Sequence, residues 1–112
     1  MKKLGKAAPW MVLGLLLTAT VASVADDPGK AVFMAQKCNL CHSVTSQSID
    51  RTMKSSKAPD LSNVGATRTA DWITKFLKKE EMIDGKKHPK TLTATPEETT
   101  QLVKWVSGLK KG

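Results

Sequence analysis

The feature that most constrains this chain is a pentapeptide with the pattern C-x-x-C-H, from Cys38 to His42. It contains both cysteines of the 112-residue sequence and one of its two histidines. The pattern is typical of covalent attachment of a c-type haem, in which each thiol adds to one vinyl group of the porphyrin. His42 then lies below the iron and supplies an imidazole nitrogen as ligand. A chain with this motif has to fold around a large, flat, apolar cofactor.

Three other interpretations of the two cysteines compete with haem attachment. A thioredoxin-like dithiol needs a βαβ context, which the sequence pattern does not indicate. A zinc site needs four ligands, and the chain offers only Cys38, Cys41, His42 and His88. Adjacent residues such as Cys41 and His42 fit one tetrahedral ion poorly. A structural disulfide across two intervening residues is the third alternative. Haem attachment is favoured because it uses both thiols and the adjoining histidine.

The N-terminus has the organisation of a secretory signal peptide. A basic start with Lys2, Lys3 and Lys6 is followed by an uncharged segment over 7–25 that ends in small residues, Ala22 to Ala25. We therefore predict that residues 1–25 are removed and that residues 26–112 form the working domain in the periplasm. The alternative is an uncleaved membrane anchor, because about 20 residues are just enough to span a bilayer.

The remaining sequence predicts an all-α domain. Helical patterns cover about 28–41, 70–79 and 96–109, and no segment shows the alternation of a strand. Each pattern begins with a capping signal: Asp27 before Pro28, Thr69, and a capping box of Thr95 and Glu98 around Pro96. The apolar faces expected to pack are Gly29, Val32 and Phe33; Trp72, Ile73, Phe76 and Leu77; and Leu102, Trp105, Val106 and Leu109.

With these features the chain resembles a class I cytochrome c over nearly all of residues 28–109. Gly29 and Phe33 in the first helix, with Trp105 in the last, are similar to the crossing of the family's terminal helices. There a glycine permits close approach and an aromatic side chain fills the gap. The resemblance implies three main helices wrapped around one haem c, with its iron, held covalently through Cys38 and Cys41.

The resemblance also implies roles for two residues outside the C-x-x-C-H motif. Pro59 matches the family's loop proline, whose carbonyl oxygen accepts the Nδ1–H of the proximal histidine, here His42. Such a hydrogen bond orients the ring and tunes the metal. Trp72 matches a tryptophan of the middle helix that lies against the haem. For Trp72, ordinary core packing is an equally good interpretation.

The sixth ligand is where this sequence departs from the family's pattern. Members usually carry a methionine just before the last helix, and the aligned position here is His88. We predict that His42 and His88 both bind the iron. Met82 is the alternative, followed by an open or different sixth site. Methionine ligation raises the reduction potential relative to histidine, so a bis-histidine iron implies a lowered potential.

The predicted function is single-electron transfer between redox proteins, and the chain is not expected to be an enzyme. The sequence offers no acid/base pair or nucleophile arrangement for catalysis on a substrate. The alternatives are a haem subunit of a larger oxidoreductase complex and a haem-based gas or redox sensor. A tight complex on purification would favour the first, and rapid binding of carbon monoxide to the reduced protein would favour the second.

A lysine-rich segment suggests the kind of partner. The formal net charge is +8, and lysines cluster on the middle helix and the segment that contains His88. This cluster would steer the molecule toward an acidic docking surface. A solvated face that keeps a small protein soluble is the alternative. We expect a monomer that binds no nucleic acid and meets a membrane only if the N-terminal segment is retained. The lysines of the cluster are Lys75, Lys78, Lys79, Lys86 and Lys87.

Overall fold

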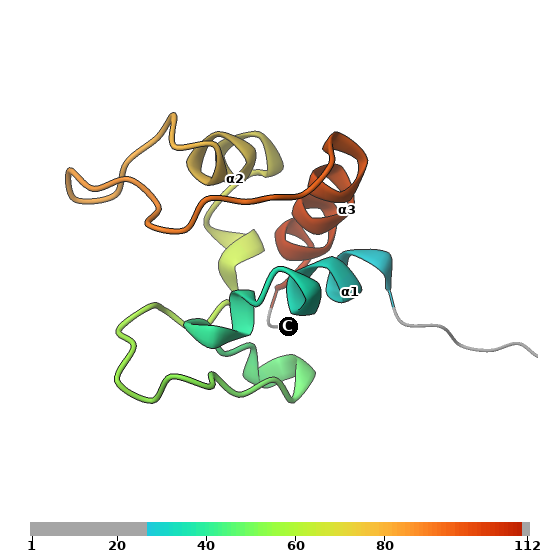
Figure 1. Ribbon diagram of the computed structural model, residues 1–112, viewed down its shortest axis with the longest axis vertical. Coiled ribbons are helices and arrows are strands. Elements are labelled where there is room, and N and C mark those ends of the chain that lie inside the picture. The colour runs from blue at the N-terminus through green and yellow to red at the C-terminus, as the bar shows by residue number, and fades with distance from the viewer. Residues whose placement is uncertain (1–26, 111–112) are drawn as a thin grey trace, which may run out of the picture.

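Three α-helices joined by long loops make up the described part of the chain, as this computed structural model shows (Figure 1). Helix α1 spans Pro28–Ala35, α2 spans Ala70–Leu77 and α3 spans Pro96–Ser107. Within residues 27–110 there is no strand, and the pairing is limited to two isolated bridges. The predicted all-α class is confirmed. Three short 3₁₀ helices also occur within residues 27–110: η3 (Cys38–Leu40), η4 (Thr45–Gln47) and η5 (Val64–Ala66).

The structure describes residues 27–110. The predicted signal peptide over 1–25, and its alternative as an anchor, lie outside these residues. None of the helices in the described range has the length and apolar character needed to cross a membrane.

Side chains cap all three α-helices where the sequence predicts it. Asp27 Oδ1 accepts from the backbone N–H of Gly29 at 2.8 Å, with Pro28 in the first turn. Thr69 Oγ1 accepts from the N–H of Trp72 at 3.1 Å. These bonds satisfy N–H groups that have no acceptor within their helix. At α3 the capping box is complete, because Thr95 and Glu98 each accept from the other's backbone N–H.

The first helix is shorter than predicted. The sequence pattern indicated a helix to Cys41, whereas α1 ends at Ala35. Lys37 adopts the left-handed conformation (φ 61°, ψ 34°), which cannot continue a right-handed helix. The chain then turns through η3, so that the C-x-x-C-H motif lies on a separate tight turn. The break redirects the backbone before the two cysteines.

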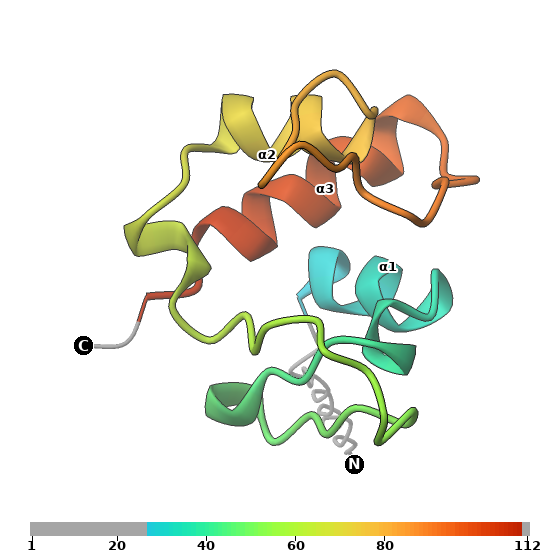
Figure 2. The same ribbon diagram turned by 90° about the vertical axis from the view of Figure 1, so that its left-hand side faces the viewer.

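The core forms where α1 crosses α3, as seen from the side in Figure 2. Gly29 makes the crossing possible, because a Cβ atom there would collide with the Gln101 carbonyl oxygen and the Trp105 side chain. The Phe33 and Trp105 rings then meet with centroids 5.3 Å apart at 57°, and Leu102 is fully buried beside them. An aromatic pair of this kind stabilises a fold beyond the area it buries.

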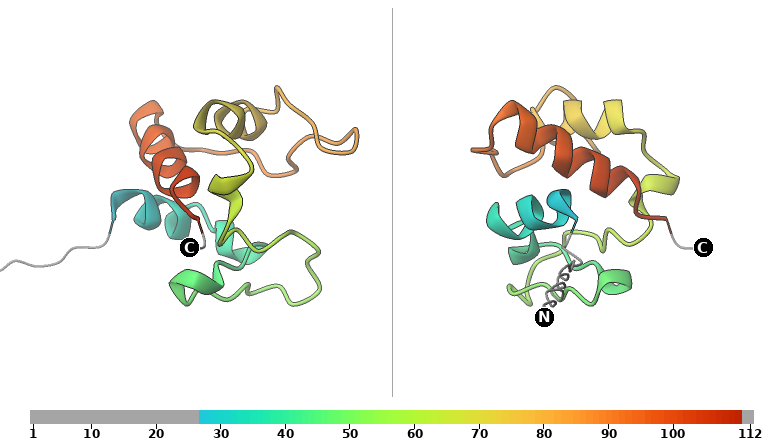
Figure 3. Two further views of the ribbon diagram at one scale, coloured as in Figure 1. Left: turned by 180° about the vertical axis from the view of Figure 1, so that it is seen from behind. Right: turned by 90° about the vertical axis from the view of Figure 1, so that its right-hand side faces the viewer.

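The two long loops extend on the side of the molecule away from α3. Figure 1 shows residues 43–63 in green and 80–95 in orange reaching in the same direction, and Figure 3 shows this arrangement from behind. Between them η5 is fixed to the end of α3, since the N–H of Gly65 donates to the Leu109 carbonyl at 2.8 Å. The helices therefore provide a stable base from which both loops project.

Candidate haem site

The two cysteines lie on the turn that leads directly into His42. The backbone N–H groups of Cys41 and His42 both donate to the Cys38 carbonyl, at 3.3 and 3.0 Å. This turn presents two half-buried thiols that are not joined in a disulfide. Burial raises the pKa of the Cys38 thiol to about 11, against an opposing effect of the Lys90 charge. Before the haem is attached, Cys38 is therefore a protonated thiol at neutral pH.

The His42 ring is oriented by the loop proline. Nδ1–H of His42 donates to the Pro59 carbonyl at 2.7 Å, which is the hydrogen bond that the resemblance implies. Burial lowers the pKa of His42, although the bond to Pro59 acts in the opposite direction. The imidazole is consequently neutral at pH 7, and Nε2 is the ring nitrogen that remains available to a metal.

His88 is held in a similar way from the other loop. Its Nδ1 lies 3.0 Å from the Lys90 carbonyl, two residues further along the chain. The loop is tied to α2 because Lys79 Nζ donates to the Pro89 carbonyl at 3.3 Å. A bridge between Ile83 and Lys86 closes the preceding turn. As in His42, the Nδ1 atom of His88 is the one next to a backbone carbonyl, and Nε2 is the nitrogen that could bind a metal.

The fold brings the two histidines of the sequence together. Their ring centroids are 6.3 Å apart and their planes differ by 7°. A metal–imidazole bond is about 2 Å long and the ring nitrogen lies about 1 Å from the ring centre, so one metal ion between two Nε2 atoms separates the centres by roughly 6 Å. The observed spacing therefore fits an iron between His42 and His88.

Comparison with known proteins is consistent with this geometry. A family model described as Cytochrome c matches residues 27–110, which is most of the chain. The chain belongs to the cytochrome c family. Searches of curated proteins and of solved structures each gave no match. The cofactor is therefore haem c with its iron, covalently bound, and the C-x-x-C-H cysteines fit its attachment. As a cytochrome c, the protein is a haem-based electron carrier that serves redox partner proteins.

The remaining predicted site residues of the cytochrome, Trp72 and Met82, differ in how far they are buried. Trp72 is half-buried against the hydrophobic core, with the Arg68 guanidinium 3.9 Å from the centre of its ring. Met82, the alternative sixth ligand, exposes 55% of its surface. Among the described residues, no group of three or more potential metal-binding His, Cys, Asp or Glu side chains was found.

One contact of His88 could not be inferred from the sequence. The centroids of the Phe76 and His88 rings are 5.2 Å apart and their planes make an angle of 77°, so the rings meet edge to face. Phe76 was expected in the apolar face of α2, and that periodicity says nothing about a partner in a loop. The only indication would have been the aromatic side chain itself, placed twelve residues before the histidine.

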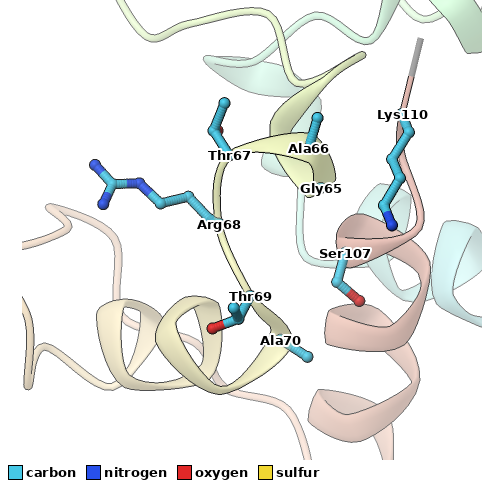
Figure 4. A pocket seen from close by; sticks show the side chains of 8 residues that line it. All are labelled: Gly65, Ala66, Thr67, Arg68, Thr69, Ala70, Ser107 and Lys110. Atoms are coloured by element: carbon cyan, nitrogen blue, oxygen red, sulfur yellow. The ribbon is translucent and has the colours of Figure 1, made fainter. Parts of the chain in front are cut away.

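One pocket lies apart from the predicted haem-binding residues. A pocket of about 400 Å³ lies between η5, the start of α2 and the end of α3 (Figure 4). Lys110 and Ser107 line one side of it, and Arg68 points away from them toward Trp72. None of the predicted haem-binding residues lines this pocket.

An aspartate next to Pro59 anchors the proximal loop. Asp60 Oδ2 accepts from the Ser43 hydroxyl at 2.7 Å and from the Thr45 N–H at 3.0 Å. Asp60 Oδ1 accepts from the Ser62 N–H at 2.8 Å. Desolvation alone would raise the pKa of Asp60, but the hydrogen bonds from Ser62, Ser43 and Thr45 outweigh it and hold the pKa well below its usual range. The carboxylate thus fixes the segment that carries the Pro59 carbonyl.

We expect Asp60→Asn to lower the free energy of unfolding by about 1 kcal/mol at pH 7, a value reduced for solvent screening because the side chain is exposed. The folded state holds the pKa below the ordinary 3.8, so the stabilisation is complete above about pH 4 and is lost as the pH falls toward the folded pKa. Urea unfolding at pH 7 and near pH 2 measures this difference. The exposed Asp50→Asn is the matched control, and an equal loss for Asp60→Asn at both pH values would contradict the prediction.

Proposed function

We propose that this cytochrome is a periplasmic, monomeric carrier of single electrons whose iron is held by His42 and His88. The observation that carries the proposal is the pair of nearly parallel imidazoles 6.3 Å apart. In both, Nδ1 is engaged by a backbone carbonyl, at Pro59 and at Lys90. When bound, the haem supplies exchange between Fe(II) and Fe(III).

The residues around the site suit this role. Cys38 and Cys41 anchor the porphyrin next to the proximal histidine. Two nitrogen ligands held by hydrogen bonds keep the same positions in both oxidation states, which limits the rearrangement that accompanies electron transfer. A second histidine in place of methionine favours Fe(III), so we propose a potential below that of a His/Met relative with the same fold.

The periplasmic location rests on the sequence of residues 1–25, with its basic start and its small residues before Asp26. An exported compartment also suits a protein whose only two cysteines are used for haem attachment. Mass spectrometry of the protein purified from the periplasmic fraction tests this part. A mass equal to residues 26–112 plus one haem is the expected result.

The electron paramagnetic resonance spectrum of the oxidised protein, recorded beside its optical spectrum, tests the ligation. We expect a low-spin spectrum typical of two imidazole ligands and no charge-transfer absorption from iron–sulfur ligation. The reduced protein should bind carbon monoxide slowly at neutral pH, because His88 has to leave first. An iron–sulfur band would contradict the proposal, and rapid carbon monoxide binding would favour a sensor instead.

We also propose that the lysines near His88 form the docking surface for an acidic partner. Lys86 and Lys87 are exposed in the loop that carries this histidine. Other lysines of the cluster have local roles: Lys75 pairs with Asp71 at 3.3 Å, and Lys79 binds the Pro89 carbonyl. Lys86 and Lys87 therefore add positive charge beside His88 to that of the exposed Lys78 after α2.

We expect the double variant Lys86→Glu/Lys87→Glu to react about tenfold more slowly with the anionic oxidant hexacyanoferrate(III) at low ionic strength. Added salt should remove most of the difference by screening. Stopped-flow oxidation of the reduced protein measures the rates. Lys104→Glu/Lys110→Glu, on and beyond α3, changes the net charge equally and is the matched control. Equal slowing in both variants would show that only net charge matters.

A further inference from the structure

The ring of Phe76, a residue of helix α2, contacts the ring of His88. Its centroid lies 5.2 Å from that of His88, with the two planes at 77°. Edge arrangements of aromatic rings at this distance are attractive and directional. The contact matters because His88 belongs to a loop without regular secondary structure, whereas Phe76 belongs to α2.

Phe76 is itself fixed by its neighbours on the same face. The Trp72 ring stacks on it with centroids 4.9 Å apart at 20°, and Arg68 lies over Trp72 at 3.9 Å. The spacing of four residues from Arg68 to Trp72 to Phe76 places the three side chains along one side of α2 and the turn before it. A column of planar groups therefore runs from Arg68 to His88.

The hydrogen bond of His88 cannot by itself set the ring's orientation relative to His42. Its acceptor, the Lys90 carbonyl, is only two residues away in the same loop. If the loop shifts, ring and acceptor move together and the bond survives. Phe76 provides a reference outside the loop, which a shift of the loop would break.

We propose that Phe76 is a positioning residue that holds the plane of His88 nearly parallel to that of His42, at the observed 7°. This inference rests on the proposed bis-histidine ligation. The arrangement has a spectroscopic consequence. Parallel imidazole planes lift the degeneracy of the two iron d orbitals that interact with the ligand π systems, whereas crossed planes leave them nearly degenerate. The first case gives a rhombic spectrum with three resolved features, and the second gives one dominant feature at low field.

The experiment compares electron paramagnetic resonance spectra of the oxidised holoprotein. We expect wild type and Phe76→Tyr, which keeps the ring, to give the rhombic spectrum. Phe76→Ala should shift toward the low-field type or give a mixture of both. Phe76→Leu keeps most of the apolar volume without a ring, and it provides a folded variant if Phe76→Ala does not fold. Leu77→Ala is the matched control, since Leu77 packs against the core from the same helix.

A kinetic measurement adds a second readout. The loss of one aromatic pair corresponds to about a two- to tenfold change in an equilibrium constant. Carbon monoxide should therefore replace the sixth ligand of the reduced Phe76→Leu protein about two- to tenfold faster than in wild type. Phe76→Tyr should restore the wild-type rate.

The outcomes separate this inference from the proposed function. A wild-type spectrum without two imidazole ligands would overturn both. A bis-histidine wild type whose spectrum and carbon monoxide rate are unchanged in Phe76→Ala or Phe76→Leu would overturn the role of Phe76 alone. The same spectral change in Leu77→Ala would also overturn it, because general loosening of α2 would then be sufficient.

Discussion

We expect His88→Met to change the ligand field of the iron and to raise its reduction potential. A thioether is a weaker donor than imidazole and favours Fe(II). The rise should be on the order of 0.1 V, a modest part of the roughly 0.8 V range over which axial ligands set haem potentials. The oxidised variant should also gain the charge-transfer absorption of an iron–sulfur bond. Spectroelectrochemical titration of wild type and variant measures both effects.

Met82→Leu is the control for this experiment, because Met82 is the alternative ligand. With 55% of its surface exposed, its replacement should leave the spectrum and the potential of wild type unchanged. Identical ligand fields in wild type and His88→Met would show that His88 does not bind the iron. In that case a spectral change in Met82→Leu would identify the methionine as the ligand.

Much of the fold could be predicted because the deciding interactions are local or depend on particular residue types. Asp27 and Thr95 cap helices through bonds to residues two and three positions away, so the sequence contains both partners. The haem motif is equally local, since its cysteines and histidine share one turn. The contact of Gly29 with Trp105 is distant in sequence, and it was expected because the resemblance to the family implies a crossing of the terminal helices at a glycine.

Other features could not be predicted, because they depend on backbone atoms and backbone conformation rather than on a particular side chain. The Lys90 carbonyl that orients His88 is a backbone atom, so no side chain indicates the hydrogen bond. Lys37, two residues after the end of α1, adopts a left-handed conformation for which lysine has no preference, so the residue type does not indicate the break. Phe76 fits the helical spacing of apolar residues in α2. That spacing does not show whether its ring contacts the core or a histidine in a loop. Periodicity identifies a helix face but not its partners.

The substitution Gly29→Ala should be strongly destabilising, although alanine is the better helix former by about 1 kcal/mol. The new Cβ would collide with the Gln101 carbonyl oxygen and the Trp105 side chain, and a backbone atom cannot move away without separating the helices. Separation would weaken the contact of Phe33 with Trp105. We expect the free energy of unfolding to fall by about 3 kcal/mol, the upper end for overpacking in a core. Guanidinium unfolding followed by circular dichroism measures this loss.

Gly108→Ala is the matched control, since it adds the same methyl group at the end of α3. Its Cβ would lie 3.4 Å from the carbonyl oxygens of Lys104 and Trp105, close to ordinary contact, and the backbone (φ −87°) accepts any residue. The control should therefore stay within about 0.5 kcal/mol of wild type. Thermal midpoints should differ by roughly 10 to 20 °C between the two variants, given 4–8 °C for each kcal/mol in a domain of this size. If Gly29→Ala were as stable as Gly108→Ala, the close approach of α1 to α3 would not be what holds this cytochrome together.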